Sequence, residues 1–191
     1  MRIFVFLLLL NCVLSLNFLS TNKRLKSSSS VSDLKQKLVK LTKNTNNGVS
    51  ASQASRLEID SVVNELERLN PTKSLTNTKL LDGNWELLYT TNEGSSAGKL
   101  GPFVGKVNQI IDFDAKQYVN TVSLFGNLIV ASLDATWNKK SDKAWEVIFQ
   151  SLKFELFGIK VKQSSLSAVG IWRKSYIDNN LRILYAKGGT L

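Results

Sequence analysis

The sequence contains no histidine, and its only cysteine and only methionine, Cys12 and Met1, lie near the N-terminus. Beyond residue 12 these absences exclude imidazole-dependent triads and dyads, histidine general bases, thiolate zinc sites and disulfides. Catalysis there would have to use carboxylate, lysine, tyrosine or hydroxyl groups. We therefore expect no metal site and no bound cofactor.

Length and charge favour one domain with extensions. The chain has 191 residues, of which 43% are hydrophobic and 21% charged, enough for one globular core. Arg2 and residues 17–43 account for +7 of the net charge of +10, which leaves +3 for residues 44–191. That remainder has no basic stripe interleaved with aromatic residues, so nucleic acid is not an expected partner.

The N-terminal segment is typical of targeting sequences. The apolar run from Ile3 to Leu10 is too short to span a bilayer comfortably, so residues 1–16 are predicted to be a signal peptide. Residues 17–43 are rich in Lys, Arg, Ser and Thr, and residues 17–32 are assigned to a transit peptide. A signal followed by a transit-like stretch resembles the bipartite presequences of algae with secondary plastids, and Phe18 is similar to the aromatic residue found there. A short membrane anchor and plain secretion are the alternatives.

Residues 33–72 are predicted to form a helical segment. Apolar residues recur at steps of three and four, first from Val31 to Leu41 and again from Ile59 to Leu69, which indicates two amphipathic helices. Ser50 or Ser52 can cap the second, and Asn70-Pro71 ends it. Neither helix is rich in Trp or Phe, which favours packing on the domain over packing on lipid.

From Asn84 onward the apolar pattern has period two, so residues 80–191 are expected to be a mainly β domain. No helix-length segment intervenes, so the strands should be antiparallel and joined by short turns. About eight such strands close most readily into an up-and-down barrel, and an open sandwich is the alternative. The predicted strands are 84–91, 106–113, 117–125, 127–137, 144–156, 159–164, 168–177 and 181–187.

Gly83 and Trp85 in "LLDGNWELLYTT" suit the entrance to a barrel, where glycine turns the chain and tryptophan fills the closed end. This G-x-W pattern is similar to the entry motif of lipocalins, whose late arginine lies over the tryptophan, and Arg182 is placed to do so. On the strand around residues 127–137, two alanines among five apolar residues on one face leave room for a ligand. The alternative is that these residues fill the core themselves. The candidate ligand-binding residues are Trp85, Leu87, Tyr89, Ile129, Ala131, Leu133, Ala135, Trp137, Val147, Phe149 and Asp178.

Residues 31–191 resemble the plastid lipid-associated protein family, also called fibrillins or plastoglobulins. The resemblance is carried by the helical preface, "LLDGNWELLYTT", "GKVNQIID" followed by "YVNTV", and "WRKSYIDNNLRILYAKGG". It implies a lipocalin-like, non-catalytic protein that binds hydrophobic small molecules at plastoglobules or thylakoids. Asn180 and Leu184 depart from the family pattern, and the family often has a further apolar stretch beyond the position of Leu191.

Two other functions stay open at this point. The protein could coat lipid globules with no internal ligand. Alternatively, it could be a lipocalin-fold enzyme that acts on a hydrophobic substrate through Asp112, Asp178 or Tyr89. The expected partners are a lipid ligand and a membrane or lipid-globule surface.

Overall fold

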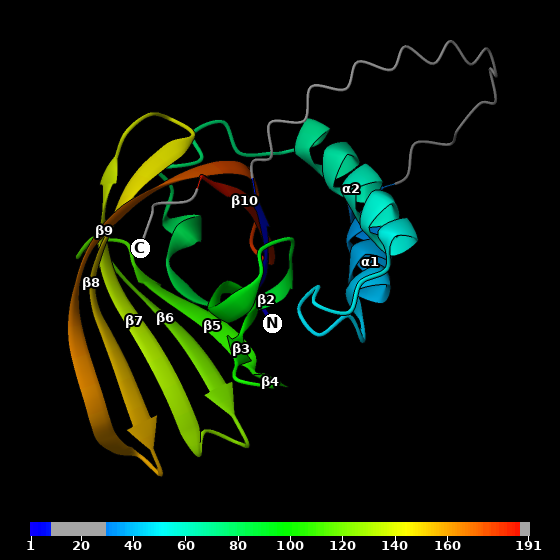
Figure 1. Cartoon of the computed structure of the whole chain (residues 1–191). Helices are drawn as coiled ribbons and strands as arrows, with labels where there is room; N and C mark the ends of the chain where they lie inside the picture. Colours follow the sequence, from blue (N-terminus) through cyan, green and yellow to red (C-terminus); the bar gives the residue numbers. More distant parts are fainter. Residues whose placement is uncertain (9–29, 188–191) are drawn as a thin grey trace, which may run out of the picture.

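Eight strands close into a barrel in the computed structural model, which describes residues 1–8 and 30–187 (Figure 1). The order around the barrel is β1-β10-β9-β8-β7-β6-β5-β2. A small ribbon of β3 (Lys99–Leu100) and β4 (Phe103–Val104) lies outside this ring. The barrel strands are β1 (Ile3–Leu8), β2 (Gly83–Thr90), β5 (Lys106–Asp112), β6 (Gln117–Leu124), β7 (Ile129–Lys139), β8 (Ala144–Leu156), β9 (Ile159–Ile177) and β10 (Leu181–Lys187).

The strands from β5 to β10 follow the sequence prediction closely. Neighbours along the chain pair antiparallel through short turns, and the expected mainly β barrel is confirmed. One boundary prediction is wrong, because β9 is a single strand of 19 residues and not two strands that meet near residue 166. Its register against β8 shifts between Phe149 and Ser151, so a bulge absorbs the interruption in the apolar pattern.

β1 is the unexpected strand. It pairs parallel with both β10 and β2, with Ile3 opposite Leu181 and Glu86. The barrel is therefore not purely antiparallel. Phe4 points to the interior core and Val5 to the opposite face, so six residues predicted to belong to a signal peptide alternate like a barrel strand. Residues 9–29, which include the rest of the signal segment and most of the transit region, lie outside the described residues. The last three residues of the predicted transit region are described: Ser30 caps the first helix, and Val31 and Ser32 begin it.

The two predicted helices are present as α1 (Val31–Thr42) and α2 (Gln53–Arg68). Ser30 and Asp33 form a capping box at the start of α1, and Ser52 caps α2 by accepting from the Ser55 amide. Two short 3-10 helices, η1 (Lys79–Leu81) and η2 (Gly94–Ala97), precede and follow β2.

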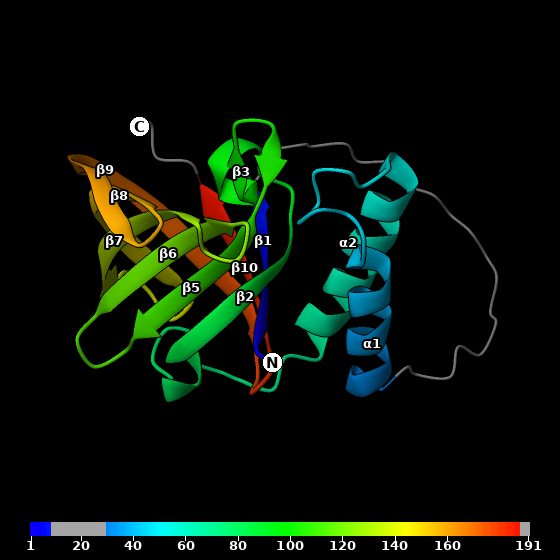
Figure 2. The same cartoon turned by 90° about the horizontal axis from the view of Figure 1, so that it is seen from below.

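The helices pack side by side against one side of the barrel (Figure 2). Their apolar residues, such as Leu38 and Ile59, form a core with outward-facing side chains of β1, β2, β9 and β10. Both are fully buried, so the expected packing of the helices on the domain is observed. A second core fills the barrel itself, and the candidate site lies there.

Candidate functional site: the barrel interior

Trp85 and Arg182 meet at one end of the interior, as the sequence pattern predicts. The Arg182 guanidinium carbon lies 4.9 Å from the centroid of the Trp85 ring, and both side chains are buried. The Trp85 indole donates to the Leu81 carbonyl over 2.8 Å, and Arg182 donates to the Gln109 side-chain oxygen. The indole is thus fixed between a cation and its own hydrogen bond.

Arg2 supplies a second cation to the same tryptophan, which sequence reasoning missed. Its guanidinium carbon lies 4.1 Å from the Trp85 ring centroid, and its nitrogens donate to the carbonyls of Leu80 and Asp82. Gly83 has a φ of +101°, and a Cβ there would lie 2.9 Å from an Arg2 nitrogen. The positive φ favours glycine at this position, because a residue with a Cβ rarely adopts it.

Lys174 of β9 is the most unusual interior residue. It is fully buried, its Nζ lies 3.2 Å from the centroid of the Trp145 ring, and that Nζ has no hydrogen-bond partner among residues 1–8 and 30–187. Burial lowers the pKa of Lys174 well below its ordinary value, and the charge of Arg182 lowers it further. Burial, followed by the charge of Arg2, likewise lowers the pKa of Arg182 to about 9.

The buried ionisable side chains of the interior are basic. Among the described residues, no aspartate or glutamate is classed as buried, whereas Lys174 and Arg182 both are. The alternation of "GIWRKSY" places Lys174 on the same strand face as Trp172, so the sequence pattern contained this signal.

Aromatic and small side chains line the remainder. Trp137 and Trp145 stack with ring centroids 3.8 Å apart and an interplanar angle of 9°. The predicted residues found in this core are Trp85, Leu87, Ala131, Ala135, Trp137 and Val147, with Phe149 packed against them. Ile129 and Leu133 are half-buried on β7. Interior residues that the sequence analysis missed include Phe4, Phe6, Tyr118 and Trp172.

Tyr89 lies outside the interior, contrary to the prediction. Its ring belongs to the core between the barrel and the helices. Phe4 pairs with Leu87 whereas Val5 pairs with Tyr89, so Leu88 is an extra residue that shifts the register. A bulge reverses which face the following residues occupy, and a strict two-residue period therefore fails after Leu87.

Asp178 also lies outside the interior, in the turn between β9 and β10. It forms an ion pair with Lys35 of α1 and accepts hydrogen bonds from the Tyr176 hydroxyl and from the amides of Asn180 and Leu181. Burial alone would raise the pKa of Asp178, but the hydrogen bonds from Lys35, Tyr176 and the backbone outweigh it and lower the pKa. Asp178 therefore connects α1 to the barrel and does not line the barrel interior.

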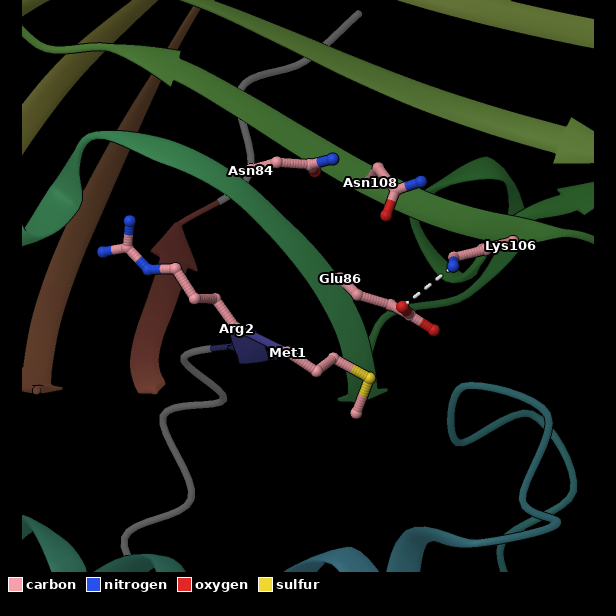
Figure 3. Close-up of a pocket in the computed structure, with 6 residues that line it drawn as sticks. All are labelled: Met1, Arg2, Asn84, Glu86, Lys106 and Asn108. Atoms are coloured by element: carbon pink, nitrogen blue, oxygen red, sulfur yellow. Dashed lines mark ion pairs between the residues drawn. The ribbon is translucent and has the colours of Figure 1, made fainter. Parts of the chain in front are cut away.

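A polar pocket of about 210 Å³ lies on the outer surface beside the start of β1 (Figure 3). Its lining residues are Met1, Arg2, Asn84, Glu86, Lys106 and Asn108. Lys106 and Glu86 form an ion pair of 2.9 Å across it. The pocket is polar, so it does not match the hydrophobic ligand that the sequence predicts.

Residues 1–8 and 30–187 contain neither a metal-binding cluster nor a membrane-spanning helix. No group of three or more Cys, Asp or Glu side chains is arranged to hold a metal ion in this part of the chain. Neither of its helices is long and apolar enough to cross a membrane.

The sequence was compared with known proteins. The profile of the PAP_fibrillin family matches residues 32–157. The chain is 30% identical over 161 residues to Probable plastid-lipid-associated protein 5, chloroplastic, of Arabidopsis thaliana, covering 83% of this chain and 67% of that protein. It is 27% identical over 168 residues to Chromoplast-specific carotenoid-associated protein C1, chromoplastic, of an Oncidium hybrid cultivar, covering 73% and 51%.

A third relative is Plastid lipid-associated protein 2, chloroplastic, of Brassica campestris, 34% identical over 126 residues that make up 61% of this chain and 39% of that protein. The chain thus spans two thirds of the first relative's length, about half of the second's and less of the third's. No solved structure matches. The family profile covers both helices and most of the barrel strands, and the chain therefore belongs to the PAP_fibrillin family.

Proposed function

We propose that the protein is a non-catalytic carrier that holds a hydrophobic small molecule, such as a lipid, a prenyl lipid or a carotenoid, inside the barrel. The observation that carries this proposal is the closed barrel whose interior is lined by aromatic side chains with small residues between them. Ala131 and Ala135 lie on the inner face of β7, where larger side chains would otherwise fill the space. The names of the relatives, which refer to lipid and carotenoid association, agree with such a ligand.

We place the protein at plastoglobules or thylakoids, and in a secondary plastid reached through the signal and transit segments. The relatives are named as chloroplastic or chromoplastic proteins, which supports a plastid. The order of an apolar segment followed by a basic, serine-rich segment supports the two-step route.

One competing function has an observation in its favour. Trp137, Trp145 and Trp172 occupy much of the interior, and small barrels are commonly filled by their own side chains. A filled barrel would serve as a coat on lipid globules. The enzyme alternative is less well supported, because Asp112 is exposed and Tyr89 and Asp178 lie outside the interior.

Enlarging the small residues distinguishes a carrier from a coat. We expect Ala131→Phe or Ala135→Phe to abolish binding of a fatty-acid or prenyl-lipid probe with little loss of stability, since the side chain would occupy the ligand's volume. In a filled core the same change would overpack the interior and cost about 1–3 kcal/mol. Fluorescence titration measures binding of the probe, and urea unfolding measures the free energy of unfolding.

Ser132→Phe is the matched control, because Ser132 is the neighbour on β7 with its side chain on the outer face. It should leave probe binding unchanged. Marked destabilisation by Ala135→Phe with unchanged probe binding would move the function to the outer surface. Native mass spectrometry of protein from its own organelle would identify the ligand.

A further inference from the structure

Two hairpin turns at one end of the barrel carry the same dipeptide, Phe-Gly. Phe125 follows β6 and Phe157 follows β8, with φ angles of +51° and +50°. This left-handed region favours Gly, Asn and Asp, and a bulky residue there is an outlier. The β8–β9 turn has positive φ at both Phe157 and Gly158, as a type I′ turn requires, and Asn-Gly is the preferred pair for such a turn.

Both phenylalanines are also exposed to solvent, Phe125 to 56% and Phe157 to 68%. Phenylalanine at these positions lowers the stability of the fold in two ways: through the left-handed backbone conformation and through an apolar ring exposed to water. The same double penalty at two separate turns points to a role for the rings outside the fold.

The two turns lie at the lower edge of Figure 1, and their exposed side chains form one apolar surface. The Phe157 amide donates to the Leu128 carbonyl over 2.8 Å, and the Phe125 ring lies 5.1 Å from the Phe103 ring of β4 in a T-shaped contact. We call this surface the apolar rim. Its exposed members are Phe103, Phe125, Leu128, Leu156, Phe157, Ile159 and Val161. Contiguous exposed apolar residues of this kind mark interaction sites in soluble proteins.

The charged residues beside the apolar rim indicate which kind of partner binds it. Lys160 and Lys162 are exposed beside it on β9, and Glu155, which pairs with Lys160 across the strands, is the nearest acid on β8. Apolar tips flanked by lysines suit an anionic lipid surface, because the rings enter the apolar layer while the ammonium groups remain at the headgroups. The helices do not offer this surface, because their apolar faces are buried against the barrel.

We propose that the apolar rim is the surface by which the protein inserts into a lipid assembly that carries anionic headgroups. The proposal rests on the proposed function for the presence of such an assembly, but it does not depend on an internal ligand. Phe125 and Phe157 are the anchors, and Lys160 and Lys162 supply the preference for anionic lipid.

The test is co-sedimentation of the full chain with phosphatidylcholine vesicles, with and without phosphatidylglycerol. Phe125→Asn and Phe157→Asn should each weaken binding by about tenfold or more, because a phenylalanine leaves the apolar layer. Asparagine fits the left-handed conformation better, so both variants should melt at the same or a higher temperature than the wild type. A loss of binding therefore cannot be attributed to unfolding.

Lys116→Asn is the matched control. Lys116 also has a positive φ, +55°, but it lies in the β5–β6 turn at the opposite end of the barrel. This variant should bind vesicles like the wild type. Lys160→Gln with Lys162→Gln should remove the preference for phosphatidylglycerol and leave the weaker binding to phosphatidylcholine.

Undiminished vesicle binding by the double asparagine variant would overturn the proposal. So would a wild-type oligomer that binds no vesicles and that the double variant cannot form, since the rim would then be a protein interface. The carrier function and the vesicle binding fail separately. Ala135→Phe should lose binding of the probe but keep vesicle binding. The double asparagine variant should lose vesicle binding but keep binding of the probe.

Discussion

Lys174 and Arg182 place two basic groups in an interior built mainly of indole, phenyl and methyl groups. For Lys174 the contact with Trp145 contributes about 0.5–2 kcal/mol, whereas removing an ammonium group from water costs several kcal/mol. Desolvation therefore outweighs the ring contact. The strand period predicts that Lys174 faces inward. It cannot predict that no carboxylate of the described residues pairs with Lys174, because that depends on which strands the closed barrel brings together.

We expect Lys174→Met to stabilise the free protein at pH 7 by about 1–4 kcal/mol, the range seen when buried charges are replaced by apolar residues of similar size. The pKa of Lys174 is lowered on folding, so the unfolded chain binds the extra proton between the two pKa values and wild-type stability rises with pH there. The advantage of the variant should therefore shrink as pH approaches the ordinary lysine pKa. Urea unfolding at several pH values measures this.

The contrary result is equally informative. If Lys174→Met destabilises the protein purified from its organelle, the lysine must have an anionic partner there. Extraction with organic solvent before unfolding would then remove the difference.

At the scale of elements, the helices and the strands from β5 to β10 could be predicted from the sequence, because each has a regular spacing of apolar residues and ends at a recognisable turn or cap. Ser52 and Pro71, for example, limit α2 by local chemistry. The bulge at Leu88 could not be read, because it depends on pairing with β1, and Tyr89 was misplaced as a result. Asp178 is a predicted ligand-binding residue, but its partner Lys35 lies 143 positions away and only the fold brings the two together.

The attachment of α1 to the barrel through Asp178 can be tested directly. Asp178→Asn removes the charge that holds Lys35 and weakens the acceptor of the Tyr176 hydroxyl. We expect a loss of about 1–3 kcal/mol at pH 7, typical of a broken hydrogen bond to a charged group. The pKa of Asp178 is lowered on folding, so its contribution is present above the unfolded pKa and is lost as pH falls through the folded value.

The difference in unfolding free energy between Asp178→Asn and the wild type should therefore disappear at acidic pH. Glu58→Gln is the control, because the Lys37–Glu58 pair links α1 to α2 and both side chains are half exposed. It should change stability by less than about 1 kcal/mol. A pH-independent effect of Asp178→Asn would show that the carboxylate charge does not hold the helix.

For the whole molecule, the closing strand and the predicted signal peptide are the same residues. A chain cut between residues 18 and 45, as the two targeting segments predict, would lose β1, whose Val5 is fully buried between barrel and helices. The backbone edges of β2 and β10 would then lack the partner they have in this structure. Composition could not reveal the strand, because an apolar run of this length satisfies both a signal peptide and a buried strand.

Val5→Asp in the full chain tests whether β1 closes the barrel. A carboxylate at this position would be buried without a partner, so we expect a loss of about 3–5 kcal/mol and faster amide exchange along β2 and β10. Val39→Asp on the exposed side of α1 is the control and should change little. Unchanged exchange in Val5→Asp would show that the barrel edges do not depend on β1, and N-terminal peptide mapping of native protein would show whether the mature chain keeps it.

The parallel placement of β1 also constrains the order of events in a new chain. Residue 3 pairs with residue 181, which is synthesised 178 residues later. The strands from β5 to β10 pair with neighbours along the chain, whereas β1 must wait for β2 and then for β10 to be synthesised, and contacts of such long sequence separation form slowly. Until β10 is synthesised, the N-terminal segment lacks one of its two strand partners and is more accessible to a targeting or processing machinery. The time between synthesis and barrel closure would then decide whether these residues act as a targeting signal or become a strand of the barrel.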